Sequence, residues 1–396
     1  MFKKVIIVAI ILSSLKFFSF IFIPEFIIKV AEWFGIGLIL AFTIIYFIYN
    51  KEKPIKKHFT IPIILIFISV LISMFGSYIY QNQSFPLTAY AQRAIYFYLI
   101  YFLLHLMRID SKFIIRLIVS FALIYIVIYF LQYILYPIQL TTTKMFIDRG
   151  TLRIFLSGAG YLVIAYFIWL YMAFRNFRPI YVLILLVTMG IFVLMGTRQV
   201  LASMLLLTIL FIFQSRVVKS KILIFTLIGL SLIPIYFLFQ DIILAMFEVT
   251  YRQSQHIEGG IRFEAARFFL TDFFPSALAY FTGNGAAGPS IYGLRLFRYS
   301  TELGYYLSDI GLIGEYVKYG MLYVIGVIII LFKVFKSSLP EKIMFIKYNF
   351  LGIVLTLVTG GGAFASTSNV LIICLLLYLI DLHKSDKNIF DNSVTD

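Results

Sequence analysis

The chain has 396 residues, of which 62% are hydrophobic and only 13% carry a charge. A soluble domain cannot cover its surface with so few polar residues, whereas a bilayer requires its spans to be apolar helices or closed barrels. The net charge of +15 comes from basic residues scattered through short loops, which is not the pattern of a nucleic-acid-binding domain, and we expect no nucleic-acid partner. The single Cys374 excludes an intrachain disulfide and a cysteine metal site.

Apolar runs of about 20 residues, the length of a membrane-spanning helix, follow one another along the chain. They predict an all-α polytopic membrane protein with about twelve spans in one integral membrane domain over residues 1–396. The first run starts like a signal peptide but lacks a small-residue cleavage site, so we expect a retained helix. In chain order the expected spans are 4–23, 26–49, 60–80, 93–107, 113–136, 161–174, 179–195, 199–214, 222–240, 307–331, 349–363 and 367–381.

Basic residues are distributed unevenly between the two sides of these spans. With both termini in the cytoplasm, the inner loops and ends hold 20 of the 33 basic residues, fifteen of them lysine. The outer side then carries four lysines and nine arginines. A guanidinium group binds phosphate through two parallel hydrogen bonds, so this arginine-rich side predicts an anion site, although each arginine alone is also consistent with contact to lipid headgroups. The nine arginines are Arg93, Arg149, Arg153, Arg198, Arg252, Arg262, Arg267, Arg295 and Arg298.

One outer connection, residues 241–306, is too long for a simple tether, and we expect it to form a large extracytoplasmic loop with short helices. Its segment 257–281 is predicted to be a partly amphipathic helix, broken at Pro275, that lies against lipid. Glu264 precedes Arg267 by three residues, a spacing that permits a helical ion pair and makes Arg262 the better ligand candidate. In an earlier span, Thr197 is expected to cap a helix that begins with Arg198, a cation that is unfavourable there unless an anion shares the site.

Three carboxylates, Glu302, Asp309 and Glu315, approach or enter the span that follows this loop, and carboxylates at such places are usually functional or paired. Glu315 has a local partner in Lys318, while Glu302 and Asp309 are expected to have none. Both would lie on one side of a continuous helix, because seven residues make about two turns. His256 is the outer histidine. No metal-binding motif is present in the sequence, and we expect neither metal nor cofactor.

The segments "GTRQVLASMLLL" (196–207), "GNGAAG" (283–288) and "SDIGLIGEYVKYG" (308–320), with the late outer loop, resemble the bacterial O-antigen polymerase (Wzy-type) and ligase group. The glycines of "GNGAAG" predict either a turn or backbone amides that approach an anion. The resemblance implies a metal-independent glycosyltransferase on the outer face of the plasma membrane. Its substrate would be an undecaprenyl-diphosphate-linked oligosaccharide, and its product a glycan joined to another lipid-linked repeat unit. Membrane lipid and the pathway's chain-length regulator and flippase are the other implied partners.

When the residues are matched one by one, Arg198, Arg262 and Arg267 look like the arginines of this group. The candidates for diphosphate binding are these three arginines together with Arg93, Arg149 and Arg153. Glu302, Asp309 and His256 are the candidates for the catalytic base. The ligases place a histidine about eleven residues before the glycine that is Gly311 here, and this chain has Ser300 instead, which favours a polymerase. The alternatives are a ligase, a flippase, which would show a two-fold hydropathy repeat, and a non-catalytic scaffold.

Overall fold

The computed structural model describes residues 2–49, 55–148, 151–218, 220–221, 260–357, 360 and 362–385, together with single positions between 222 and 259. The expected span 222–240 lies almost entirely outside these residues. Arg149, Arg252 and His256 lie outside them as well.

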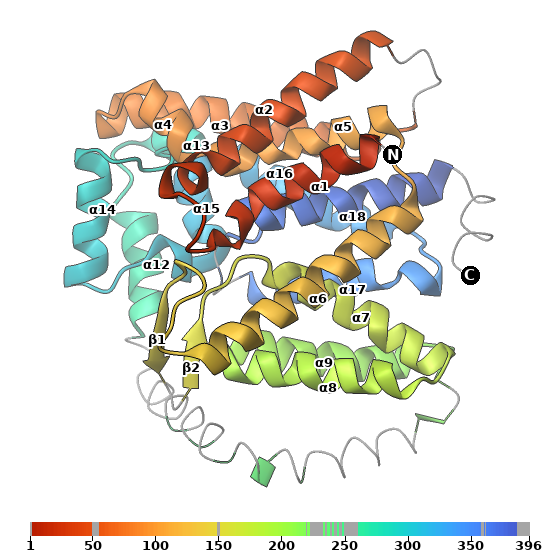
Figure 1. Ribbon diagram of the computed structural model, residues 1–396. Helices are drawn as coiled ribbons and strands as arrows, with labels where there is room; N and C mark the ends of the chain where they lie inside the picture. Colours follow the sequence, from red (N-terminus) through yellow and green to blue (C-terminus); the bar gives the residue numbers. More distant parts are fainter. Residues whose placement is uncertain are drawn as a thin grey trace. The chain divides into compact units, whose positions relative to one another are not determined.

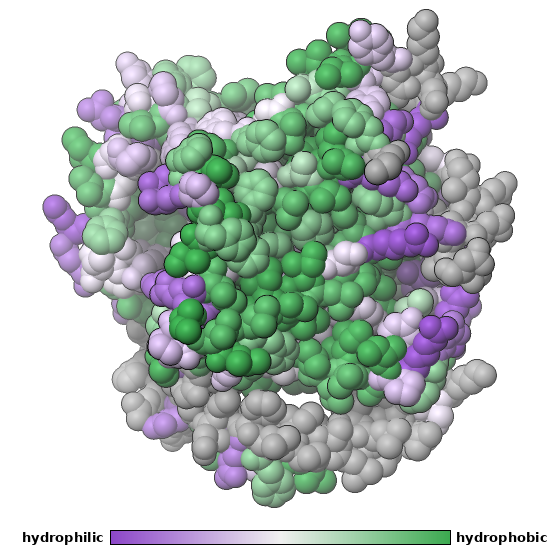
Figure 2. All heavy atoms as spheres, in the orientation of Figure 1, coloured by the Kyte–Doolittle hydropathy of each residue, from purple (hydrophilic) through white to green (hydrophobic). Residues whose placement is uncertain are grey.

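Helices predominate among the described residues, and four are long and apolar enough to cross a membrane, so the chain is a membrane protein. The four candidate spans are α2 (Glu25–Tyr49), α3 (Thr60–Gln81), α6 (Ser111–Leu135) and α18 (Thr367–Ser385). Each matches an expected span to within a few residues. Side chains such as Phe47, Ile48 and Ile134 are largely exposed, and Figure 2 shows apolar surface over α2 and α6, as a lipid-facing helix requires.

The chain divides into two compact units, and the first comprises Met1–Leu117, Ile261–Leu339 and Leu357–Asp396. In this unit α16 (Met321–Lys336) packs along α3. Gly326 of α16 allows the two helices to approach closely, since a Cβ at this position would lie only 2.9 Å from the Pro62 carbonyl oxygen of α3. Besides α2, α3 and α18, this unit contains α1 (Phe2–Ser14), η1 (Lys16–Ser19), α4 (Phe85–Ala91), η2 (Arg93–Leu99), α5 (Ile100–Met107), α12 (Ile261–Thr271), α13 (Ala277–Thr282), α14 (Ile291–Glu302), η3 (Leu307–Ile310), α15 (Gly311–Tyr319) and α16 (Met321–Lys336).

The second unit comprises Ile118–Gly260 and Pro340–Thr356. A short antiparallel hairpin pairs Phe146 with Arg153. Helix α17 (Phe345–Thr356) packs against α7 (Ala159–Arg175) and α9 (Arg198–Gln214). The elements of this unit, after the end of α6, are β1 (Met145–Asp148), β2 (Thr151–Ile154), α7 (Ala159–Arg175), α8 (Pro179–Leu194), α9 (Arg198–Gln214), η4 (Glu341–Ile343) and α17 (Phe345–Thr356).

Several expected spans are not single helices. The segment 4–23 contains α1 and then a short 3-10 turn, and 93–107 starts as a 3-10 helix before α5. The expected span 349–363 starts earlier and its helix ends at Thr356. The span 307–331 is broken at Gly320, which has φ +82° and whose missing Cβ leaves room for the Phe281 carbonyl. Hydropathy alone does not detect these breaks, because the residues on both sides are apolar.

Residues 261–310, which we call the cap, form a folded part of the first unit with an apolar core. Phe269, Phe273, Tyr292 and Leu307 are buried in this core, which α15 completes through Val317. Figure 1 shows α14 running across the direction of α18 instead of along it. The described part of the expected outer loop is therefore a structure of short helices, as predicted.

Candidate functional site

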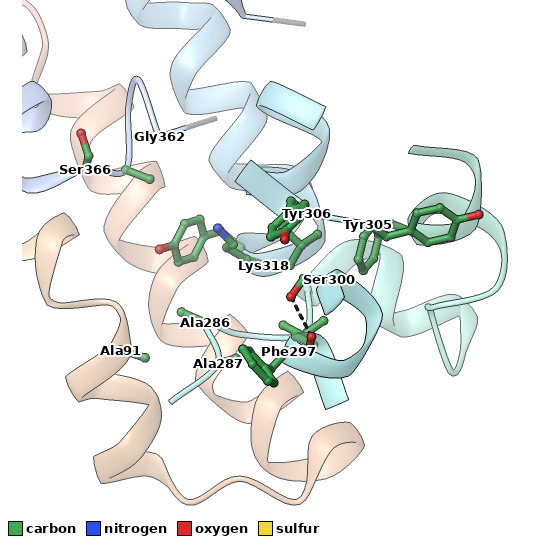
Figure 3. Close-up of a pocket in the computed structure, with 15 residues that line it drawn as sticks. Ala91, Ala286, Ala287, Phe297, Ser300, Tyr305, Tyr306, Lys318, Gly362 and Ser366 are labelled. Atoms are coloured by element: carbon green, nitrogen blue, oxygen red, sulfur yellow. Dashed lines mark hydrogen bonds between the residues drawn. The ribbon is translucent and has the colours of Figure 1, made fainter. Parts of the chain in front are cut away.

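A cavity of about 420 Å³ lies in the first unit, beneath the cap (Figure 3). Its walls come from the end of α4, from α12 and α14, from α15, and from the segment that precedes α18. The lining residues are Ala91, Phe269, Ala286, Ala287, Leu296, Phe297, Ser300, Tyr305, Tyr306, Leu307, Lys318, Tyr319, Gly362, Ala365 and Ser366. The mixture of aromatic rings, hydroxyl groups and one ammonium group is typical of a ligand site.

Lys318 supplies the charged group of this cavity. Figure 3 shows its side chain between Tyr306 and the segment that carries Gly362 and Ser366. The sequence predicted that Lys318 is the partner of Glu315. The two charges attract each other through space, but the Glu315 carboxylate accepts its hydrogen bonds from the Tyr323 hydroxyl (2.9 Å) and the Gly362 amide (2.8 Å). Among the described residues, no carboxylate lies within ion-pair distance of the Lys318 ammonium.

The segment before α18 is held at both ends by buried carboxylates. Glu315 accepts a hydrogen bond from the Gly362 amide, and Glu32 accepts one from the Thr367 hydroxyl at 2.6 Å. Between them, the Phe364 carbonyl accepts a hydrogen bond from Tyr98. These contacts fix the backbone of Gly362–Thr367, so one wall of the cavity is preorganised.

The "GNGAAG" segment is an irregular connection between α13 and α14, and four of its amides already have protein partners. Gly283 donates to the Ala279 carbonyl and Gly288 to the Gln83 side chain, both at 2.8 Å. Asn284 and Gly285 donate to the carbonyls of Val317 (2.9 Å) and Lys318 (2.7 Å). Gly283 and Gly285 have φ values near +70°, which glycine adopts without strain. The amides of Asn284 and Gly285 therefore join the cap to α15 and do not bind an anion, and the segment contributes Ala286 and Ala287 to the cavity.

Two arginines predicted to bind a diphosphate have protein partners. Arg93 donates to buried Glu32 (2.5 Å) and to the Tyr90 carbonyl (2.9 Å). In the second unit, Arg153 donates to Asp148 (2.9 Å) and to the Met195 carbonyl (3.1 Å). Both therefore have structural roles, and diphosphate binding by them stays a prediction.

Arg262 and Arg267 lie on α12 and are exposed. The expected pair between Glu264 and Arg267 is wrong: Glu264 accepts a hydrogen bond from the Tyr305 hydroxyl at 3.5 Å. Within the described residues, neither arginine forms an ion pair. Both guanidinium groups are therefore accessible to a ligand.

Arg198 opens α9, as predicted, but in the second unit. The expected cap of this helix is wrong. The Thr197 hydroxyl is buried and has no hydrogen-bond partner among the described residues.

The candidate carboxylates occupy two separate elements. Glu302 is exposed at the end of α14, and its Oε1 lies 3.8 Å from Nε of Arg298. The sequence prediction overlooked this local cation, although a separation of four residues is a helical spacing. Asp309 lies in the 3-10 helix η3 and accepts a hydrogen bond from Ser308. The expectation of one continuous helix is wrong, because residues 303–306 leave the helical conformation at Gly304 (φ +71°).

Neither of the two carboxylates, Glu302 and Asp309, lines the cavity. Each lies two residues along the chain from a lining residue, Ser300 for Glu302 and Leu307 for Asp309.

Lys318 and Ser366 were not predicted from the sequence to be site residues. Lys318 was assigned to Glu315 by its spacing alone, and Ser366 follows a glycine run that hydropathy includes in a span. Within the described ranges, no group of three or more His, Cys, Asp or Glu side chains is arranged to hold a metal ion. Comparison of the chain with protein-family models, with curated proteins and with solved structures finds no match.

Proposed function

We propose that this protein is a polysaccharide polymerase of the O-antigen or capsule type in the bacterial plasma membrane. It would transfer a glycan from an undecaprenyl-diphosphate-linked oligosaccharide to the end of another lipid-linked repeat unit. The observation that carries the proposal is the cavity beneath the cap, where aromatic rings, hydroxyl groups and a cation converge next to membrane-spanning helices.

The lining of the cavity suits a glycan attached to a phosphate. The rings of Phe297 and Tyr306 offer apolar faces on which a sugar can stack, and Ser300 and Ser366 offer hydroxyl groups. A cavity of about 420 Å³ falls within the usual range for a small-molecule site. The isoprenoid part of the donor would lie along the apolar surface of the spans.

The distribution of charged groups supports an outer location for this cavity. The cap meets α3 at its end, where Asn284 accepts a hydrogen bond from Gln81. At the start of α3, the carbonyl of His58 accepts a hydrogen bond from Lys333, and His58 also contacts Asp381 at the end of α18. Lysine-bearing ends therefore lie opposite the cap, which agrees with cytoplasmic termini and an outer cap under the positive-inside rule.

The reaction forms a bond between an acceptor hydroxyl oxygen and the anomeric carbon of the donor, and it breaks the bond from that carbon to the diphosphate. The hydroxyl proton passes to a base, for which Glu302 and Asp309 are the candidates, and the diphosphate leaves with the bond electrons. Arg262 and Arg267, exposed on the cap, would stabilise the charge that develops on the diphosphate. Ser300 stands where a ligase would have its histidine and is not a general base, so a polymerase is the better reading.

The test uses the lipid-linked glycans of a strain that lacks the protein. A polymerase predicts accumulation of single repeat units on the outer face, and plasmid-borne wild-type protein should restore polymer. The variant Ala287→Trp, which fills the cavity, should fail to restore it, while Leu278→Trp, on the exposed surface of the cap, should succeed. Accumulation of repeat units facing the cytoplasm, or of full-length unattached polymer, would overturn the proposal in favour of a flippase or a ligase.

A further inference from the structure

Lys318 is a half-buried cation at the wall of a cavity, and its charge is not neutralised by an ion pair within the described residues. Its nearest sequence neighbour of opposite charge, Glu315, is buried and directs its carboxylate to Tyr323 and Gly362. The backbone carbonyl of Lys318 accepts the Gly285 amide at 2.7 Å, so the position of the residue is fixed. In the part of the chain that the structure describes, its ammonium group has no hydrogen-bond or ion-pair partner, and Glu315 attracts it only from beyond ion-pair distance.

Other cations in the same unit behave differently. Arg93 lies on buried Glu32, and Lys333 donates to the His58 carbonyl at 2.7 Å. Partial burial of a charge is costly unless a partner compensates for it, and a methionine would fill the same space without that cost. A lysine facing an otherwise uncharged cavity is therefore expected to find its compensation in a bound anion.

We propose that Lys318 is an anion-binding residue that holds a phosphate or diphosphate group in this cavity, with the hydroxyl of Tyr306 as a further donor. A phosphate oxygen accepts several hydrogen bonds at once, and ammonium and hydroxyl groups around one space match that need. The inference rests on the proposed function for the identity of the anion, the diphosphate of the lipid-linked donor. The sequence predicted that arginines bind the diphosphate, whereas this inference assigns the binding to a lysine.

Binding can be measured apart from transfer, with the full chain in nanodiscs of phosphatidylcholine. The probes are undecaprenyl diphosphate and inorganic pyrophosphate, each radiolabelled. Lys318→Met should bind the preferred probe roughly ten- to a hundredfold more weakly, the usual loss for one charge-assisted hydrogen bond, while Lys318→Arg stays within about threefold of wild type. The control is Lys29→Met, an exposed lysine on α2 that pairs with Glu25.

A second readout separates ligand binding from structure. The thermal midpoint of Lys318→Met without ligand should equal or exceed that of wild type, because a partly buried charge has been removed. Unchanged affinity in Lys318→Met, or equal losses of affinity and midpoint in the Met and Arg variants, would overturn the inference. If the Met variant does not fold, Lys318→Arg must still bind, and binding to wild type must weaken with added salt; failure of either result rejects the site.

The two probes identify the source of the anion. Lys318-dependent binding of undecaprenyl diphosphate alone supports a lipid headgroup, and equal binding of pyrophosphate supports recognition of the free diphosphate group. Failure of this inference is distinguishable from failure of the proposed function. Lys318-dependent binding with no polymerisation by wild type rejects the polymerase and keeps the anion site, whereas polymerisation with Lys318-independent binding does the reverse.

Discussion

The carboxylate of Glu315 accepts a hydrogen bond from the backbone amide of Gly362 at 2.8 Å, although 47 residues separate them in the chain. The same carboxylate accepts a hydrogen bond from the Tyr323 hydroxyl, and Glu315 is only 2% exposed. This one contact connects α15, which carries Lys318, to the segment that carries Ser366. Two walls of the cavity are thus held by a side chain that does not line it.

We therefore expect Glu315→Leu to lower both stability and ligand binding. The change leaves the Gly362 amide and the Tyr323 hydroxyl buried without their partner, at a cost of about 1–3 kcal/mol for each group. Glu315→Gln keeps a carbonyl oxygen for the Gly362 amide and should retain most of the stability. Thermal unfolding in detergent and probe binding measure the two effects. Similar midpoints for Leu and Gln variants would show that the contact does not hold the wall.

Arg93 and Arg262 should respond oppositely to loss of charge. Arg93→Met removes the closest partner of buried Glu32 and should destabilise the protein by about 2 kcal/mol. Arg262→Met removes an exposed side chain that has no ion pair among the described residues, so the thermal midpoint should stay near that of wild type. If Arg262 contacts the diphosphate, polymer formation should fall in Arg262→Met and also in Arg262→Lys, because lysine lacks the planar fork. Normal polymer from both Arg262 variants would assign this residue to lipid headgroups.

The orientation of the chain is testable by cysteine labelling at exposed positions. Ile291 on the cap and Phe177 in an arginine-bearing connection are 83% and 76% exposed, and the native Cys374 is buried. In intact cells, a membrane-impermeant maleimide should label Ile291→Cys and should reach Phe177→Cys only after permeabilisation. The reverse labelling pattern would place the cap in the cytoplasm.

The sequence predicted the long helices well because an apolar run of sufficient length has few alternatives to a span. α2, α3, α6 and α18 were located to within a few residues. The break at Gly320 was missed because it depends on the approach of a carbonyl from residue 281, which no local pattern records. Periodicity over a short segment likewise suggested one helix from Glu302 to Asp309, where Gly304 permits a turn.

The site was harder to predict than the fold, since pairing between charged residues is decided by tertiary structure. Spacing alone matched Glu315 with Lys318 and Glu264 with Arg267. In the structure, Glu315 binds a backbone amide and Glu264 accepts from Tyr305. Arg93 shows the same limit, because its partner Glu32 is 61 residues away. A cation identified from the sequence is a candidate ligand only until its partner is known.

Glu302 and Asp309 are the candidates for the base that takes the acceptor's proton in the proposed transfer. Glu302→Gln and Asp309→Asn should each be tested with purified protein on lipid-linked repeat units. Glu302 forms an exposed pair with Arg298, and such pairs contribute little to stability, so Glu302→Gln should leave the thermal midpoint nearly unchanged. Loss of turnover in this variant would then reflect chemistry, because an amide cannot accept the acceptor's proton. We expect at least one of the two variants to lose most turnover while probe binding is retained.

Two controls make this result interpretable. Arg298→Met breaks the pair with Glu302 but keeps the carboxylate, so it should retain turnover if Glu302 is the base and the pair is only structural. His256→Ala should retain turnover in the carboxylate mechanism. If both amide variants remain active and His256→Ala is inactive, a histidine must take the proton, as in the ligases. That outcome would also change the meaning of Ser300, since a histidine from residue 256 would then serve in place of one at residue 300.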